Sequence, residues 1–161
     1  MRYSKGTIGR IFLLKFEDDD ILLEELDKFA RHEKLKAATF VFLGALKKGH
    51  IVTGPKEPVI PPEPNWKKFK DGWEVMGIGT IFTNNKGLSR TGGTAKGRRL
   101  VREPQIHVHT SMGKGEKVIT GCVRKDSKVF LVIEAIVFEL NGVKAVKDID
   151  SSTGLNLLKI L

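Results

Sequence analysis

The sequence predicts an α+β fold built mostly from an antiparallel β-sheet, with one main amphipathic helix. Runs of apolar, β-branched and aromatic residues recur along the chain, separated by Gly, Pro and Asn residues typical of turns. One segment, residues 21–34, instead repeats its apolar residues near the 3.6-residue helical period. The length of 161 residues, with no internal repeat and no shift of composition, indicates a single domain over residues 1–161.

Composition and charge narrow the class of protein. The chain has 28 Lys and Arg residues against 19 Asp and Glu, a net charge of +9, and a single cysteine. One cysteine excludes a scaffold built on internal disulfides. No apolar run approaches the ~18–20 residues of a membrane span, and the first ten residues lack the apolar stretch of a signal peptide. We therefore expect a soluble, cytoplasmic protein with no membrane partner, whose charge favours anionic partners.

The first half of the chain predicts a strand, a helix and a second strand. The first strand covers residues 11–16, and the acids of 17–20 follow it, where carboxylates favour the start of a helix. Residues 21–34 form the helix, and residues 38–45 form the second strand. Five of the six prolines fall in residues 54–64, which predicts an extended surface loop because proline cannot donate to a strand ladder.

The second half predicts four more strands, over residues 74–82, 106–111, 118–124 and 129–140. Gly77 and Gly79 lie inside the first of these, which indicates a bulge or a close backbone approach. Trp66 and Trp73 flank a basic stretch, and we expect both indoles to pack the proline-rich loop onto the domain rather than to stack on bases.

Positive charge gathers in the segment that follows residues 74–82. No acidic residue occurs between Glu74 and Glu103. We predict that the basic side chains of this segment contact DNA or another anionic partner; they are Lys86, Arg90, Lys96, Arg98, Arg99 and Arg102.

A candidate metal site lies in residues 105–122. Side chains two apart in a strand project from the same face, so His107 and His109 point the same way. If the following turn is Lys114-Gly115, or the four residues 113–116, His107 lies opposite Cys122. Two imidazoles and a thiolate would then share one ion, and the donor set suits zinc with a fourth position left open. A three-residue loop would shift the register by one and move Cys122 away from the histidines.

The same residues have a plainer interpretation. A His-x-His pair is often two polar residues on a strand, and a lone cysteine is usually a small buried hydrophobe. His50 could be a remote fourth ligand, although we expect a surface residue, and Glu134 needs solvent or a hydrogen-bond partner. No glycine-rich nucleotide motif occurs in a strand-to-helix context, so we expect no nucleotide cofactor, and the sequence identifies no catalytic residue.

Several segments together resemble the plants-and-prokaryotes-conserved (PPC) domain, found in AT-hook nuclear proteins and in stand-alone prokaryotic proteins. The most specific are Gln105-Ile106-His107-Val108-His109 and Thr153-Gly154-Leu155-Asn156. The resemblance implies an antiparallel α+β domain that assembles as a homotrimer, with structural similarity to acetolactate decarboxylase, where histidines bind a catalytic zinc. Many prokaryotic members look like His-x-His followed by Gly-Gly-His, whereas this chain has Thr120-Gly121-Cys122. The chain also lacks an Arg-Gly-Arg-Pro element, so DNA binding does not transfer with the fold.

Three functions remain open at this point. The first is a trimeric regulatory or DNA-binding module, with or without zinc, whose basic segment contacts an anionic partner such as DNA. The second is an oligomer without chemistry. The third is a zinc-dependent enzyme that acts on a small oxo- or hydroxy-acid, with the metal as Lewis acid and Arg90, Arg98 or Arg102 holding the carboxylate.

Overall fold

β-Strands make up most of the described chain, as the sequence predicts. The computed structural model describes residues 1–84 and 102–161. The elements in chain order are β1 (Thr7–Glu17), α1 (Leu22–His32), β2 (Ala37–Pro55), β3 (Pro64–Thr83), β4 (Pro104–Lys114), β5 (Lys117–Val123), β6 (Lys128–Asn141), β7 (Ala145–Ile149) and β8 (Asn156–Ile160). The helix has 11 residues, so it is a short element beside the sheet. The described part of the chain contains no helix long and apolar enough to span a bilayer.

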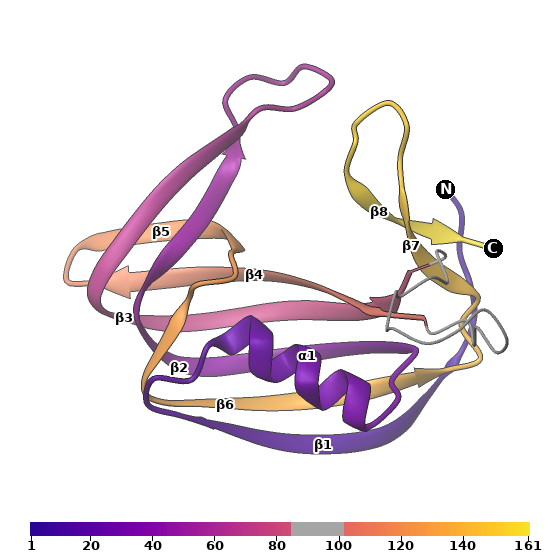
Figure 1. Cartoon of the computed structure of the whole chain (residues 1–161), viewed down its shortest axis with the longest axis horizontal. Helices are drawn as coiled ribbons and strands as arrows, with labels where there is room; N and C mark the ends of the chain where they lie inside the picture. Colours follow the sequence, from indigo (N-terminus) through magenta and orange to yellow (C-terminus); the bar gives the residue numbers. More distant parts are fainter. Residues whose placement is uncertain (85–101) are drawn as a thin grey trace, which may run out of the picture.

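The main sheet has six strands in the order β1-β6-β2-β3-β4-β5, and every pair of neighbours is antiparallel. β2 and β3 form one long hairpin that bends away from the rest of the sheet, with the proline-rich loop at its tip (Figure 1). The far part of β2 also pairs with β5, at Ile51↔Val123 and Val52↔Cys122. This pairing folds the β4–β5 edge back onto β2.

α1 packs its apolar stripe onto one face of the sheet, which we call the inner face. Leu22, Leu26 and Ala30 are buried at four-residue spacing, and the ring of Phe29 meets Phe12 edge to face with centroids 5.1 Å apart. The acids before the helix do not cap it: the N-cap is Ile21, without a side-chain cap. Their carboxylates instead accept from Lys47 and Lys128, and so join the start of the helix to the sheet.

Gly77 and Gly79 of β3 leave room for aromatic rings on the inner face. A Cβ at Gly79 would lie 2.1 Å from the Phe40 ring, and a Cβ at Gly77 would lie 2.4 Å from the Phe42 ring. The two glycines pair directly with these phenylalanines across the β2–β3 ladder. The close backbone approach predicted from the sequence is found at Gly77, where a Cβ would lie 2.5 Å from the His109 carbonyl oxygen, whereas at Gly79 only the ring approaches. The two glycines allow both rings to enter the core.

The opposite face of the sheet, the outer face, is apolar and exposed. One register row crosses all six strands in the order Leu13, Ile136, Val41, Ile78, His109 and Cys122. Leu13 is 79% exposed and Ile78 is 56% exposed. The row shows that the histidines of β4 share their face with unpacked apolar side chains.

β7 and β8 form a separate two-stranded sheet that the sequence does not predict. In Figure 1 this hairpin stands across from the bent β2–β3 arm. The Asn156 side-chain amide donates to the Gln105 side-chain oxygen of β4 at 2.7 Å. The backbone of Lys147 also forms an isolated parallel β-bridge with the backbone of Asn84. These contacts join the hairpin to the main sheet.

The predictions for the proline-rich segment are confirmed in part. β2 ends at Pro55 and β3 begins at Pro64, with the expected loop between them. Trp73 is buried and its Nε1 donates to the Lys70 carbonyl, as a packing residue should. Trp66 is 54% exposed, so its indole does not pack the loop onto the core.

Candidate metal centre

The β4–β5 hairpin carries the three predicted ligands on one face, but its register differs from the predicted one. The turn is Gly115-Glu116, between the pair Lys114↔Lys117, and Gly115 adopts a positive φ of 56°. Cys122 therefore lies opposite His109 rather than His107. The shift is two residues, and an even shift keeps every side chain on its predicted face because the strand period is two.

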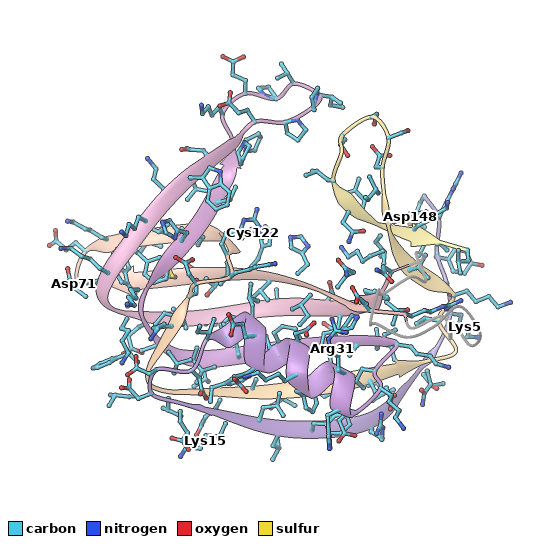
Figure 2. All side chains as sticks on the ribbon, in the orientation of Figure 1. Lys5, Lys15, Arg31, Asp71, Cys122 and Asp148 are labelled. Carbon is cyan, nitrogen blue, oxygen red and sulfur yellow. The ribbon has the colours of Figure 1, made fainter. Side chains whose placement is uncertain are left out.

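The hairpin separates ligand residues from core residues as expected. Val108 and Val123 are buried on the inner face, and Ile106 and Ile119 pack against the same core. The three candidate ligands lie on the outer face; they are His107, His109 and Cys122. One ligand atom of each lies within 4.8 Å of the ligand atoms of the other two. Figure 2 shows Cys122 facing the space between the β2–β3 arm and the β7–β8 hairpin.

The spacing of the two imidazole nitrogens fits a zinc ion. The Nε2 atoms of His107 and His109 are 3.2 Å apart, and the two rings are nearly perpendicular. Two nitrogens that share a tetrahedral zinc at about 2.0–2.1 Å are separated by roughly 3.3 Å. Two imidazole nitrogens and one sulfur also form a donor set that zinc accepts, and three protein ligands leave one position open.

The electrostatics favour the neutral, ligating form of His107. Burial by the surrounding atoms, together with the positive charges of Lys147 and Arg124 and the neighbouring His109, lowers the pKa of His107 to about 4. Burial raises the pKa of the Cys122 thiol, and the nearby Arg124 guanidinium opposes that shift. Arg124 Nη1 donates to Cys122 Sγ at 2.8 Å, which would stabilise a thiolate.

A pocket of about 470 Å³ lies beside the three ligands. One wall is β4 and β5, the second is the far part of the β2–β3 arm, and the third is the β7–β8 hairpin. Arg124 and Lys147 supply its charged side chains. The Arg124 guanidinium also lies over the Trp66 ring, 5.5 Å from its centroid, which gives this exposed indole a contact.

Of the predicted anion-binding residues, only Arg102 is described by the structure. Lys86, Arg90, Lys96, Arg98 and Arg99 fall outside the described residues. Arg102 is described and exposed, and it lines a different hollow, together with Lys34 and Lys36. It does not line the pocket beside the histidines.

Two further sequence candidates lie away from the three ligands. The Nδ1 atom of His50 is 2.5 Å from an Asp126 carboxylate oxygen, so this histidine is paired at the surface. Glu134 is exposed on the outer face, opposite Lys15 and Leu43, and it does not line the pocket.

Sequence reasoning missed Arg124 and Lys147 as residues of the site. Arg124 had a usable signal, since it is two residues from Cys122 in the same predicted strand and therefore shares its face. Lys147 had none, because its strand was not predicted and a single Lys between Val146 and Asp148 is typical of any exposed strand.

Solved structures of several proteins share this fold along nearly the whole chain. A PPC protein from Pyrococcus horikoshii is 24% identical, with a TM-score of 0.78, and the match covers 100% of this chain and 99% of that one. A metal-containing protein from Archaeoglobus fulgidus is 21% identical, with a TM-score of 0.78 and 99% of each chain covered. A proposed DNA-binding protein from Ralstonia eutropha is 17% identical, with a TM-score of 0.69, covering 92% of this chain and 90% of that one.

Family comparison gives the same result over most of the sequence. No curated protein is similar enough to the chain to count as a match. The model of the Plants and Prokaryotes Conserved (PCC) domain matches residues 3–141, which run from the start of the chain to the end of β6. The chain therefore belongs to the PCC, or PPC, domain family.

Proposed function

We propose that this protein is a metal-binding module of the PPC family, with zinc held by His107, His109 and Cys122. The observation that carries the proposal is the cluster of two imidazole nitrogens and one sulfur within 4.8 Å, on the wall of a pocket. The metal-containing relative from Archaeoglobus supports it. A thiolate ligand must stay reduced, which is why we also propose that the protein works in the cytoplasm.

Elemental analysis of the purified protein tests the metal site. We expect about one zinc ion per chain in the wild type, and loss of zinc in both His107→Ala and Cys122→Ala. His50→Ala is the matched control, because that imidazole is paired with Asp126 outside the cluster. Absence of zinc from wild-type protein produced with ample metal would refute the site.

DNA is the second candidate ligand of the molecule. Two relatives of the same fold, from Ralstonia and from Bacteroides thetaiotaomicron, are described as proposed DNA-binding proteins. The chain has a net charge of +9, and residues 85–101 contain no acid. Contacts to phosphates would make log affinity fall with log salt by about 0.9 per phosphate neutralised. Fluorescence anisotropy with a labelled duplex measures this slope, and no binding at low salt removes the candidate.

Assembly as a homotrimer is the third part of the proposal. The exposed apolar side chains of the outer face support self-association; they are Leu13, Val41, Leu43, Met76 and Ile78. Light scattering should give three times the chain mass for the wild type, and a smaller particle for Leu43→Glu. A wild-type monomer at micromolar concentration would contradict the trimer.

The alternative is a zinc-dependent enzyme that acts on a small oxo- or hydroxy-acid. The pocket beside the ligands is the observation that favours it. When bound, the ion would supply a Lewis acid toward a carbonyl oxygen. The described pocket lining contains no Asp or Glu, so the general acid or base of such an enzyme has no carboxylate candidate there.

A further inference from the structure

Lys147 is a buried amine with no acidic partner. Its side chain is only 7% exposed, and none of the described carboxylates forms an ion pair or hydrogen bond with its Nζ. Residues 85–101 contain no Asp or Glu, so that segment offers no carboxylate either. Burial of an ammonium group without an anion is unfavourable. Among the described residues, this amine therefore lines the pocket without a carboxylate partner, and an anion bound there would stabilise its charged form.

Arg124 places a positive charge on another wall of the pocket. Its guanidinium is held by two contacts, the Cys122 sulfur at 2.8 Å and the Trp66 ring at 5.5 Å. Neither contact is a carboxylate, and a guanidinium has five N–H donors, so donors remain for a ligand. Lys147 comes from β7 and Arg124 follows β5, which means that the two cations face the pocket from different elements.

The rest of the pocket is mainly apolar. Proline rings from the tip of the β2–β3 arm line one side, and leucines of the β7–β8 hairpin line another; these residues are Pro55, Pro62, Pro64, Leu155 and Leu157. The volume of about 470 Å³ falls in the range of small-molecule sites. A ligand that fits this lining needs a compact apolar body and one negatively charged end.

We propose that this pocket binds a small organic carboxylate with a branched aliphatic body, its carboxylate on Lys147 and Arg124 and its body against the prolines and leucines. This inference deepens the proposed function, and it rests on that proposal only in placing the ligand beside the metal ligands. A phosphate group suits the lining less well, because it is more strongly hydrated and finds few polar partners among these side chains. A DNA duplex is far too large to enter a space of this volume.

An NMR titration of isovalerate into chelator-treated, metal-free protein tests the pocket independently of zinc. We expect shifts of the amides of β7 and of residues near Arg124, saturating in the millimolar range. Isovaleramide, which has the same body without the charge, should bind at least ~10-fold more weakly, since a charge-assisted contact is lost. Inorganic phosphate should not compete at equal concentration. Equal binding of isovalerate and isovaleramide, or competition by phosphate, would overturn the carboxylate assignment.

Variants of Lys147 complete the test. Lys147→Met should weaken isovalerate binding by at least ~10-fold and leave the fold intact, because it replaces a buried charge by an apolar chain of similar length. Lys147→Arg should retain binding. Lys144→Met is the matched control, because Lys144 is an exposed lysine three residues earlier in the chain. Unchanged affinity in folded Lys147→Met refutes the inference. Zinc content measured on each variant before the chelator treatment separates the two proposals, since either ligand can be lost without the other.

Discussion

Two hairpins each form a wall of the pocket, and they are built differently. β4–β5 lies within the main sheet, with ladders to β3 on one side and to β2 on the other. β7–β8 is a two-stranded sheet of its own, joined to the main sheet by few polar contacts. The first hairpin supplies the three candidate metal ligands, and the second supplies Lys147. The difference indicates that the proposed metal site depends on sheet register, whereas the proposed carboxylate site depends on the docking of a separate two-stranded sheet.

The largest effect should come from breaking the register of the first wall. A Cβ at Gly121 would lie 2.2 Å from the Val52 carbonyl oxygen, a backbone atom that cannot turn aside. Gly121→Ala should therefore separate β5 from β2, destabilise the protein by at least ~2 kcal/mol and abolish zinc binding. Thermal unfolding and elemental analysis measure both effects. Gly113→Ala is the control, because a Cβ there meets nothing within 4 Å.

The second prediction changes the donor at Cys122 and leaves the register intact. Cys122→Ser keeps the shape of the side chain but replaces the thiolate by a hydroxyl, a much poorer zinc ligand. Zinc affinity should therefore fall by more than ~100-fold, which exceeds the loss expected from changing a residue that only supports a ligand. Cys122→His should retain zinc with three imidazoles. Competition with a chromophoric chelator gives the affinities. Equal zinc affinity in Cys122→Ser and wild type would show that the sulfur is not a ligand.

The third prediction loosens the second wall. Asn156→Ala removes the hydrogen bond to Gln105, worth about 0.5–1.5 kcal/mol. Isovalerate affinity should fall a few-fold while zinc affinity stays unchanged. Gln105→Ala should have the same effect, and the double variant should be no weaker than either single one because both remove the same bond. Additive losses would mean that the two side chains act separately.

The smallest effect should be a pH dependence of the β7–β8 hairpin. The Asp150 carboxylate accepts hydrogen bonds from Ser152 and Thr153 in the turn, which lowers its pKa from near 3.8 to about 2. A lowered pKa means that the carboxylate stabilises the hairpin above about pH 3.8, and that this contribution is lost as the pH falls toward 2. Amide signals of the hairpin followed by NMR across this range should report the loss. In Asp150→Asn the same signals should lack that transition.

The same contrast explains which parts of the molecule could be predicted from sequence. The six strands of the main sheet and α1 follow from long apolar runs and from one helical period, and the face shared by His107, His109 and Cys122 follows from strand alternation. The exact pairing of Cys122 did not follow. It depends on which residues form the turn, and the positive φ of Gly115 selects Gly115-Glu116 over Lys114-Gly115.

The second wall could not be predicted because its strands carry little pattern. β7 and β8 have five residues each, and β7 mixes two buried residues, Val146 and Lys147, with charged and exposed neighbours. The family model also ends at residue 141, before this hairpin begins. Lys147 reaches the pocket only through tertiary packing, and no local signal of the sequence encodes that contact.

The row from Leu13 to Cys122 has a thermodynamic consequence. Ile78 pairs directly with His109, so a body that buries Ile78 comes within one strand spacing, about 4.8 Å, of that imidazole. Water access to an ion held by His109 and the covering of this face would then be coupled equilibria. Linkage is reciprocal: if bound metal changes the affinity between two copies by some factor, association of the copies changes the affinity for metal by the same factor. If covering the outer face raises the affinity for zinc, dilution that separates the copies would weaken zinc binding with no change in any ligand.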